Sequence, residues 1–178
     1  MANNFIKIKD YYPTQQESFF FDNNIWMFLF SPIAQYQKEK QKTYSRFFEK
    51  ALESGSTIFT SSLILSEFVN RNLRMAFDRW KEMTSNYSAQ YKKDYIGCND
   101  YKDNISLIKK SVNKILASSE KISDNFRNID IDKIQSLLEI IDYNDSYILE
   151  LASSQRFTIV TDDRDFLKIE TNVHIIGI

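Results

Sequence analysis

The sequence predicts an α/β protein built on a parallel sheet. Short apolar runs alternate with longer helix-favouring stretches, and a strand, a helical crossover and a second strand are the repeating unit of parallel sheets. The runs are nearly continuously apolar, as is typical of strands that are buried on both faces. Only three glycines and two prolines occur in 178 residues, which favours long helices over many tight turns. The length is that of one domain with a core of its own.

The first elements follow from apolar runs and helix breakers. Residues 1–17 are mixed and polar, with a proline at position 13, and are expected to form an extended N-terminal lead-in. The run SFFFD at residues 18–22 predicts a buried strand that stops at a carboxylate. Residues 25–30 predict a short helix that ends before Pro32. Residues 37–54 favour a helix that Gly55 ends.

The middle of the chain is predicted to be mostly helical. The run TIFT at residues 57–60 predicts a second strand, after which Ser61 or Ser62 caps a helix that continues through residue 73. Residues 74–118 predict two further helices, separated at the sequence GCND of residues 97–100. These two helices are expected to form an extended insertion.

The last third of the chain again alternates between predicted strands and predicted helices. Weak and strong apolar runs predict strands, and the stretches between them predict helices. The expected strands are residues 119–123, 157–161 and 173–176, and the expected helical segments are residues 131–141, 142–155 and 163–168. Residues 157–161 (FTIVT) carry the clearest strand pattern, and no repeat or linker divides the chain.

Charge is unevenly distributed although the net charge is only −1. Residues 71–114 contain ten Lys and Arg against five Asp and Glu, a balance of +5, so the rest of the chain carries −6. One interpretation of this balance is a solvated helical surface whose composition arose by chance. The alternative is a functional basic strip that lies beside an acidic site. Arg and Lys in this region alternate with Tyr87, Tyr91 and Tyr95 at four-residue spacing. Such a stripe packs against a neighbouring helix or subunit, or stacks on unpaired bases.

The compartment is predicted from cysteine usage and hydropathy. A single cysteine, Cys98, excludes an intramolecular disulfide and fits a reducing cytosol. The N-terminus lacks the pattern of a signal peptide, and no apolar run approaches the roughly 18 residues that span a membrane. A cytoplasmic protein without membrane contact is therefore expected.

Two aspartates follow predicted strands. Asp22 ends the first strand, and Asp163 lies two residues after the strand at residues 157–161. Ligands of open parallel sheets collect at the carboxyl ends of the strands, so both side chains are candidates for a site. The alternative is that each aspartate only forms a turn or caps a helix, as aspartates often do.

Two further acids lie on predicted helices. Asp145 precedes Ile148 and Leu149 by three and four residues, which places it on the inward face of its helix, although it could equally be part of a cap at the helix start. Glu67 lies beside an apolar stripe, and its alternative role is an ion pair with Arg71 four residues later.

Together these four acids predict a metal centre. They are placed to converge at one edge of the sheet, where carboxylates about 5 Å apart repel one another by roughly 3 kcal/mol per pair at an effective dielectric constant of about 20. A hard dication offsets that repulsion, and an oxygen-only ligand set suits Mg²⁺ or Mn²⁺ rather than zinc.

The motifs resemble those of PIN-domain nucleases, in particular the small VapC-type toxins. The matching segments are FFFDNNIW, TSSLILSEFVNR, NDSYILELASSQRFTIVTDDRDF and the terminal NVHIIGI. The third is specific, because its first aspartate stands sixteen residues before the threonine of T-x-D-x-D-F. The resemblance implies a three-layer α/β/α domain over residues 18–178 with a short central parallel sheet and a helical insertion at about residues 74–118.

Site residues follow from the resemblance by position. It implies that Asp22, Glu67, Asp145 and Asp163 are the catalytic and metal-binding acids. Supporting roles go to Thr161, which would orient the site by hydrogen bonding, to Asn24 after the first aspartate, and to Asp165 as an auxiliary acid.

The implied activity is Mg²⁺- or Mn²⁺-dependent hydrolysis of RNA that leaves a 5′-phosphate and a 3′-hydroxyl. Glu67 would orient or deprotonate the attacking water. The resemblance further implies an antitoxin protein partner and a homodimer. One competing hypothesis is a catalytically silent PIN-like module that binds RNA or protein. A phosphotransfer protein or an aspartyl-phosphate phosphatase is discounted, because Asn24 stands where that class needs a second aspartate.

Overall fold

The computed structural model describes residues 4–34 and 38–178, and the strands of that part of the chain form one parallel sheet. The order across the sheet is β1-β6-β5-β2-β3-β4, and every neighbouring pair is parallel. The strands are β1 (Phe5–Lys7), β2 (Ser18–Phe21), β3 (Thr57–Thr60), β4 (Glu120–Lys121), β5 (Thr158–Val160) and β6 (Ile175–Gly177). The predicted mixed α/β fold with a short parallel sheet is confirmed.

The edge strand β1 lies within the segment that was expected to be only an extended lead-in. Phe5 pairs with Ile175, and Lys7 with Gly177, so the start of the described chain extends the sheet beyond β6. A 3-10 turn follows at Ile8–Asp10. The predicted extended lead-in therefore contains an edge strand and a 3-10 turn at residues 5–10. Residues 1–3 of that segment lie outside the described residues.

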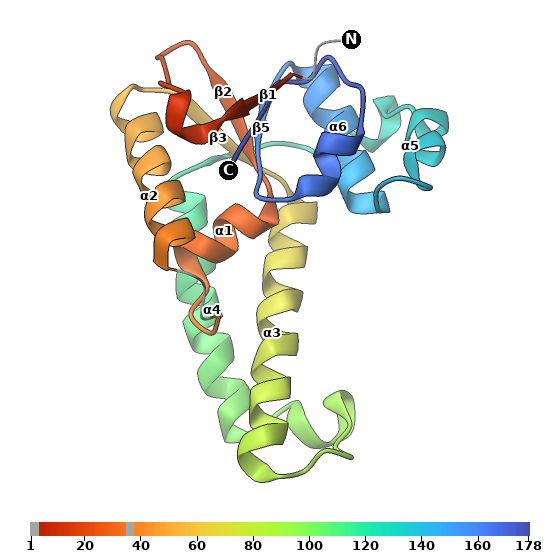
Figure 1. The fold of residues 1–178 in the computed structure, drawn as a ribbon. Helices are drawn as coiled ribbons and strands as arrows, with labels where there is room; N and C mark the ends of the chain where they lie inside the picture. Colours follow the sequence, from red (N-terminus) through yellow and green to blue (C-terminus); the bar gives the residue numbers. More distant parts are fainter. Residues whose placement is uncertain (1–3, 35–37) are drawn as a thin grey trace.

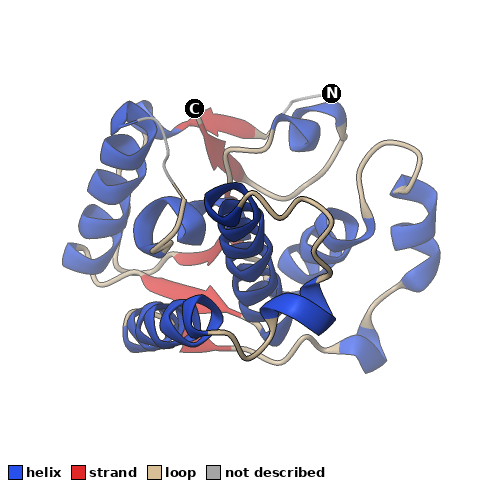
Figure 2. Ribbon diagram, turned by 90° about the horizontal axis from the view of Figure 1, so that it is seen from below, coloured by secondary structure: helices blue, strands red, loops and turns tan. Residues whose placement is uncertain are grey.

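Helices cover both faces of the sheet (Figure 2). They are α1 (Asn23–Phe30), α2 (Lys38–Glu53), α3 (Ser62–Thr84), α4 (Asn99–Ala117), α5 (Ile131–Leu137) and α6 (Tyr143–Gln155). Side chains satisfy free backbone N–H groups at several of their starts, as at α3, where Ser61 Oγ accepts from the N–H of Ile64 at 3.4 Å. Position 37, the expected start of the second helix, lies outside the described residues. None of the helices described is both long and apolar enough to cross a bilayer.

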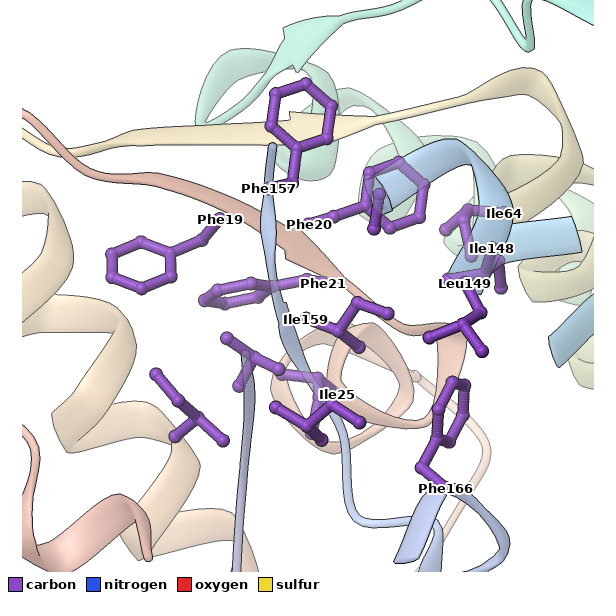
Figure 3. Packing of buried hydrophobic residues seen from close by; sticks show 14 of the residues in the cluster. Phe19, Phe20, Phe21, Ile25, Ile64, Ile148, Leu149, Phe157, Ile159 and Phe166 are labelled. Carbon is purple, nitrogen blue, oxygen red and sulfur yellow. The ribbon is translucent and has the colours of Figure 1, made fainter. Parts of the chain in front are cut away.

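The three phenylalanines of β2 show why the sheet is buried on both faces. Phe19 and Phe21 contact Phe47 of α2, with ring centroids 5.4 and 6.2 Å apart. Phe20 points to the opposite face, where it stacks on Phe157 at 6.3 Å (Figure 3). All three phenylalanine side chains are fully buried, as expected for a central strand between two helical layers.

A helical arm, defined as residues 70–110, projects from the sheet domain (Figure 1). Its first half is the continuation of α3, a single helix of 23 residues and about 35 Å that ends at Thr84. The prediction of a separate helix after residue 73 is wrong, because nothing interrupts α3 there. The predicted break at residues 97–100 is confirmed: Gly97 has a φ of 91°, and α4 starts at Asn99.

Aromatic packing holds the tip of the arm together. Tyr95 is fully buried, and its ring lies 5.3 Å from that of Phe77 and 5.4 Å from that of Trp80. Tyr91 and Tyr95 lie on one π-helical turn (Tyr91–Tyr95), whereas Tyr87 lies outside it and is 73% exposed. The three tyrosines at four-residue spacing therefore do not lie on one helix face. Of the two predicted alternatives, packing against a neighbouring helix is the one that describes Tyr95.

Candidate active site

The first candidate acid, Asp22, ends β2 and caps α1. Its Oδ1 accepts from the N–H of Asn23 at 2.5 Å, and its Oδ2 accepts from Nδ2 of Asn24 at 2.5 Å and from Oγ1 of Thr161 at 2.7 Å. The pKa of Asp22 is raised to about 7, mainly by burial; the hydrogen bonds from Thr161 and Asn23 lower it, and the charges of Glu67 and Asp163 raise it. Asp22 therefore has a capping role and also lies among other acids.

Thr161 links the ends of β2 and β5. Besides donating to Asp22, its Oγ1 accepts from Nδ2 of Asn24 and from the N–H of Asp163, both at 3.0 Å. Oδ1 of Asn24 in turn accepts from the N–H of Asp162 at 3.1 Å. Asn24 and Thr161 thus hold two chain segments together that are more than 130 residues apart in the sequence.

Asp163 and Asp165 lie on the loop and 3-10 turn after β5. Oδ1 of Asp163 accepts from the N–H of Asp165 at 2.8 Å, so the predicted capping alternative describes part of its role. The carboxylate of Asp165 forms an ion pair with Lys168 at 2.6 Å. Asp165 therefore lies next to the candidate acids, and its charge is already paired with that of Lys168.

Glu67 lies in the second turn of α3 and faces the start of α1. Its Oε1 accepts from Nδ2 of Asn23 at 3.0 Å. The alternative ion pair with Arg71 is not formed within the described residues. The Oδ1 atom of Asn23 is buried and has no hydrogen-bond partner in the described part of the chain, so a further oxygen acceptor lies beside Glu67.

Asp145 is the least constrained of the four acids. The cap of α6 is Asp142, whose Oδ1 accepts from the N–H of Asp145 at 2.9 Å, so the capping alternative applies to Asp142. The carboxylate of Asp145 is partly buried and forms no hydrogen bond or ion pair within residues 4–34 and 38–178. Burial raises its pKa to about 8, with the charges of Asp22, Asp142, Asp163 and Glu67 adding to the rise in that order.

The topology explains why these acids lie toward the same edge of the sheet. From β2 the chain adds β3 and β4 on one side, and it later adds β5 and β6 on the other side. Asp22 follows β2 and Asp163 follows β5, so they flank the point where the order of the strands reverses, and Glu67 comes from the helix after β3. Sites of open α/β sheets form at such a switch point, outside the carboxyl ends of the strands.

The donor set fits a hard divalent cation in its chemistry. Its ligands would be carboxylate oxygens, which Mg²⁺ and Mn²⁺ prefer, and the buried unpartnered oxygen of Asn23 lies next to them. Across the described residues no three His, Cys, Asp or Glu side chains lie close enough together to hold an ion. The acids thus interact electrostatically while standing apart, an arrangement that mutual repulsion favours.

Several polar residues near the site were not singled out from the sequence. Asp162 accepts from Nζ of Lys40 at 2.6 Å and from the hydroxyl of Tyr44 at 3.1 Å, and the same hydroxyl donates to the carbonyl of Thr161 at 3.1 Å. These contacts fix the loop after β5 to α2. Neither Lys40 nor Tyr44 carries a local signal of this role, because both lie within an ordinary amphipathic helix. The repeated asparagine after Asp22 is a signal that could have identified Asn23.

Comparisons with known proteins agree with this architecture. A family model described as the PIN domain matches residues 19–172. The structure is similar to a chain in the crystal structure of VapBC2 from Rickettsia felis bound to a DNA fragment from their promoter, with a TM-score of 0.55, 17% identity, and coverage of 89% of this chain and 96% of that chain. It also matches PAE2754 from Pyrobaculum aerophilum, with a TM-score of 0.46, 16% identity, and coverage of 90% and 91%. The search of curated proteins returned no match.

Proposed function

Because the chain belongs to the PIN domain family, whose members are generally nucleases, we propose that it is a metal-dependent endoribonuclease that hydrolyses phosphodiester bonds in RNA. The observation that supports this proposal best is the set of four acids from four distant segments at the switch point of the sheet. Burial is the main cause of the raised pKa values of Asp22 and Asp145, and the charges of the other acids raise both values as well. Such perturbed groups mark functional sites more often than ordinary surface positions.

In this proposal Asp22, Asp145 and Asp163, which do not lie close enough together to share an ion in the structure described, would approach one another to hold one Mg²⁺ or Mn²⁺. When bound, the ion would offset the charge of the acids and of the scissile phosphate, and would make a nearby water more acidic. Thr161 and Asn24 keep the carboxylate of Asp22 in one orientation through their hydrogen bonds. A fixed carboxylate loses little conformational entropy when it takes up a ligand.

Glu67 is proposed to orient or deprotonate the attacking water. Its carboxylate accepts one hydrogen bond from Asn23 on Oε1, which leaves Oε2 free to accept from a water. Attack by water on phosphorus, with the bond to the 3′-oxygen breaking and a proton going to that oxygen, would leave a 5′-phosphate and a 3′-hydroxyl. Asp165 is proposed as an auxiliary acid that becomes available when its ion pair with Lys168 opens.

The test is cleavage of mixed RNA by the purified chain with Mn²⁺, with Mg²⁺ and with EDTA. We expect metal-dependent cleavage that Asp22→Asn and Glu67→Gln each reduce by about 100-fold or more, a loss of the size typical for a group that acts directly in general acid–base or electrostatic catalysis. Asp132→Asn is the matched control, because it makes the same charge change at an exposed position on α5. Circular dichroism shows whether each variant keeps its fold.

The outcomes separate the nuclease from its alternative. Undiminished cleavage by Asp22→Asn would exclude the proposed role of that carboxylate. No cleavage by the wild type, together with retained binding of RNA in EDTA, would favour the catalytically silent module. Running the same assay on single-stranded DNA shows whether RNA is preferred.

We further propose that the chain acts in the cytoplasm as the toxin of a toxin–antitoxin pair and forms a homodimer. The VapC-like motifs at residues 144–166 support the toxin role, and the VapBC2 complex is an example of such a pair in this fold. Co-expression with the protein encoded by the adjacent reading frame tests it. Copurification and relief of growth arrest are expected, and unchanged toxicity would contradict an antitoxin relationship.

A further inference from the structure

The solvent-exposed face of α3 continues from the acids onto the helical arm. Asn70, Arg71 and Arg74 follow Glu67 by three, four and seven residues, so all of them lie on the face of α3 that carries Glu67. At 1.5 Å per residue, Arg71 lies about 6 Å and Arg74 about 10 Å farther along the helix axis than Glu67. Both arginines are exposed.

Neither arginine is neutralised by an acid of the described chain. The ion pairs among the described residues involve neither Arg71 nor Arg74. The next acid along this face, Asp78, already pairs with Lys81 at 2.8 Å. The two guanidinium groups are therefore available to an anion that approaches along α3.

A hollow of about 360 Å³ opens beside Arg74, lined by Asn70, Arg74, Phe77 and Tyr91. This volume lies at the small end of the range of roughly 300–1,000 Å³ for ligand pockets. The Tyr91 ring packs edge-on against Phe77, with centroids 5.4 Å apart at 80°. The lining thus combines aromatic surface, an amide and a guanidinium, which are the groups that stack on and hydrogen-bond to an unpaired base.

The charge of the surrounding arm favours a polyanion. Residues 71–114 carry +5, and two of their five acids are engaged, Asp78 with Lys81 and Asp100 with Arg79 at 3.9 Å. Lys92 and Lys93, next to Tyr91 in the chain, are exposed. A positive arm next to an acidic site steers a phosphate backbone to one side of that site.

We propose that this face of α3 is the track along which single-stranded nucleic acid runs from the acidic site onto the helical arm. Arg71 and Arg74 neutralise phosphates of the strand, and the hollow beside Tyr91 takes one unpaired base. This inference rests on the proposed nuclease function and assigns the substrate class of that same site. It also gives the basic strip of residues 71–114 a role distinct from that of a merely solvated surface.

The experiment measures binding of a short fluorescein-labelled RNA of mixed sequence by fluorescence anisotropy in EDTA, with the same sequence as DNA in parallel. Arg71→Ala combined with Arg74→Ala is expected to weaken affinity about ten-fold or more. It should also reduce the slope of log K against log salt by about 1.4, at roughly 0.7 per lost phosphate contact. Lys38→Ala with Lys42→Ala is the matched control, because it removes the same charge from exposed positions of α2, outside the arm and the hollow.

A second pair of variants tests the hollow without changing the charge. Tyr91→Leu is expected to weaken binding about five-fold or more and to leave the salt slope unchanged, as loss of one stacked base does. Tyr87→Leu is its control, because Tyr87 is 73% exposed and does not line the hollow. If Tyr91→Leu lowers the melting temperature, Asn70→Ala replaces it, since this exposed position lines the hollow and its amide would hydrogen-bond to the base.

Equal affinities of the arginine variant and the lysine control would overturn the track. A change of oligomeric state in the arginine variant, without a change in affinity, would make this face an interface between two copies and would also overturn it. Metal-dependent cleavage by the wild type with unchanged binding by the arginine variant would refute the track alone. Weakened binding by that variant without any wild-type cleavage would refute the nuclease and keep the track.

Discussion

Replacing Asp145 by asparagine should stabilise the metal-free protein at neutral pH. Asp145 is partly buried, lacks a partner within the described residues, and has a pKa raised from 3.8 to about 8 by burial and by the charges of neighbouring acids, Asp22 first. Ionising this carboxyl therefore costs folding free energy. Asparagine has almost the same shape and no charge, so Asp145→Asn removes the cost while it keeps the side-chain volume.

The magnitude follows from the linkage between protonation and folding. A rise of about three pKa units between the unfolded value and pH 7 corresponds to about 4 kcal/mol as an upper limit, at 1.36 kcal/mol per unit. Partial exposure screens this energy, and the variant also loses a favourable carboxylate in the first turn of α6, worth up to about 1 kcal/mol. A net gain of about 1–2 kcal/mol remains, which corresponds to roughly 3–6 °C in Tm for a chain of this size.

The sign of the pH dependence is specific. Because the folded-state pKa of Asp145 is raised, the stability that its neutral form contributes is complete below about pH 4 and is lost as the pH rises through about 8. The advantage of Asp145→Asn should thus be absent near pH 4 and should grow between pH 5 and pH 8. Asp132→Asn, exposed on α5, is the control and should show no such growth.

Differential scanning fluorimetry across this pH range, in EDTA and then with Mn²⁺, measures these effects. Added Mn²⁺ should raise the Tm of the wild type more than that of Asp145→Asn, because the ion offsets a charge that the variant lacks. A variant no more stable than the wild type at pH 7.5 in EDTA would refute the reasoning about burial and repulsion. Identical metal-induced shifts would show that Asp145 is not a ligand.

Three further perturbations test the site, the sheet and the helical arm. Thr161→Val removes the hydrogen bond that lowers the pKa of Asp22, so the cleavage rate should fall about ten-fold and its acidic limb should move to higher pH, with Thr161→Ser restoring both. Gly177→Ala should lower the Tm by several degrees, since the added Cβ would lie 2.5 Å from the carbonyl oxygen of Thr161, and an unchanged Tm would contradict this close packing. Tyr95→Phe leaves Asp100 without the phenol at 2.9 Å, and calorimetry should show a loss of about 1 kcal/mol.

Most of the fold could be predicted because its elements carry local signals. The central strands are continuous apolar runs, and the helices after β2 and β3 begin at a capping aspartate and a capping serine, Asp22 and Ser61. The positions of the four candidate acids relative to these elements are likewise a property of the chain order. The rule that parallel strands present their carboxyl ends at one edge places these acids toward the same side of the sheet.

Local patterns could not predict contacts made far along the chain. Phe5 joins the sheet through Ile175, which is 170 residues away, and a three-residue edge strand has too few positions to show a period. The same is true of Asn23, whose role depends on Glu67 in another helix. The sequence also did not show that α3 continues unbroken to Thr84, because its continuation is stabilised by packing against α4.

The sequence by itself determined most of the strands and helices and the acids that follow them, because apolar periodicity and capping are energetics of neighbouring residues. Only the tertiary structure decided which acids remain unpaired. Asp163 and Asp165 find a backbone donor and a lysine, whereas Asp145 is brought beside other carboxylates with no partner in the described chain. Burial and the summed field of distant charges cause that difference, and neither can be predicted from a single segment of the sequence.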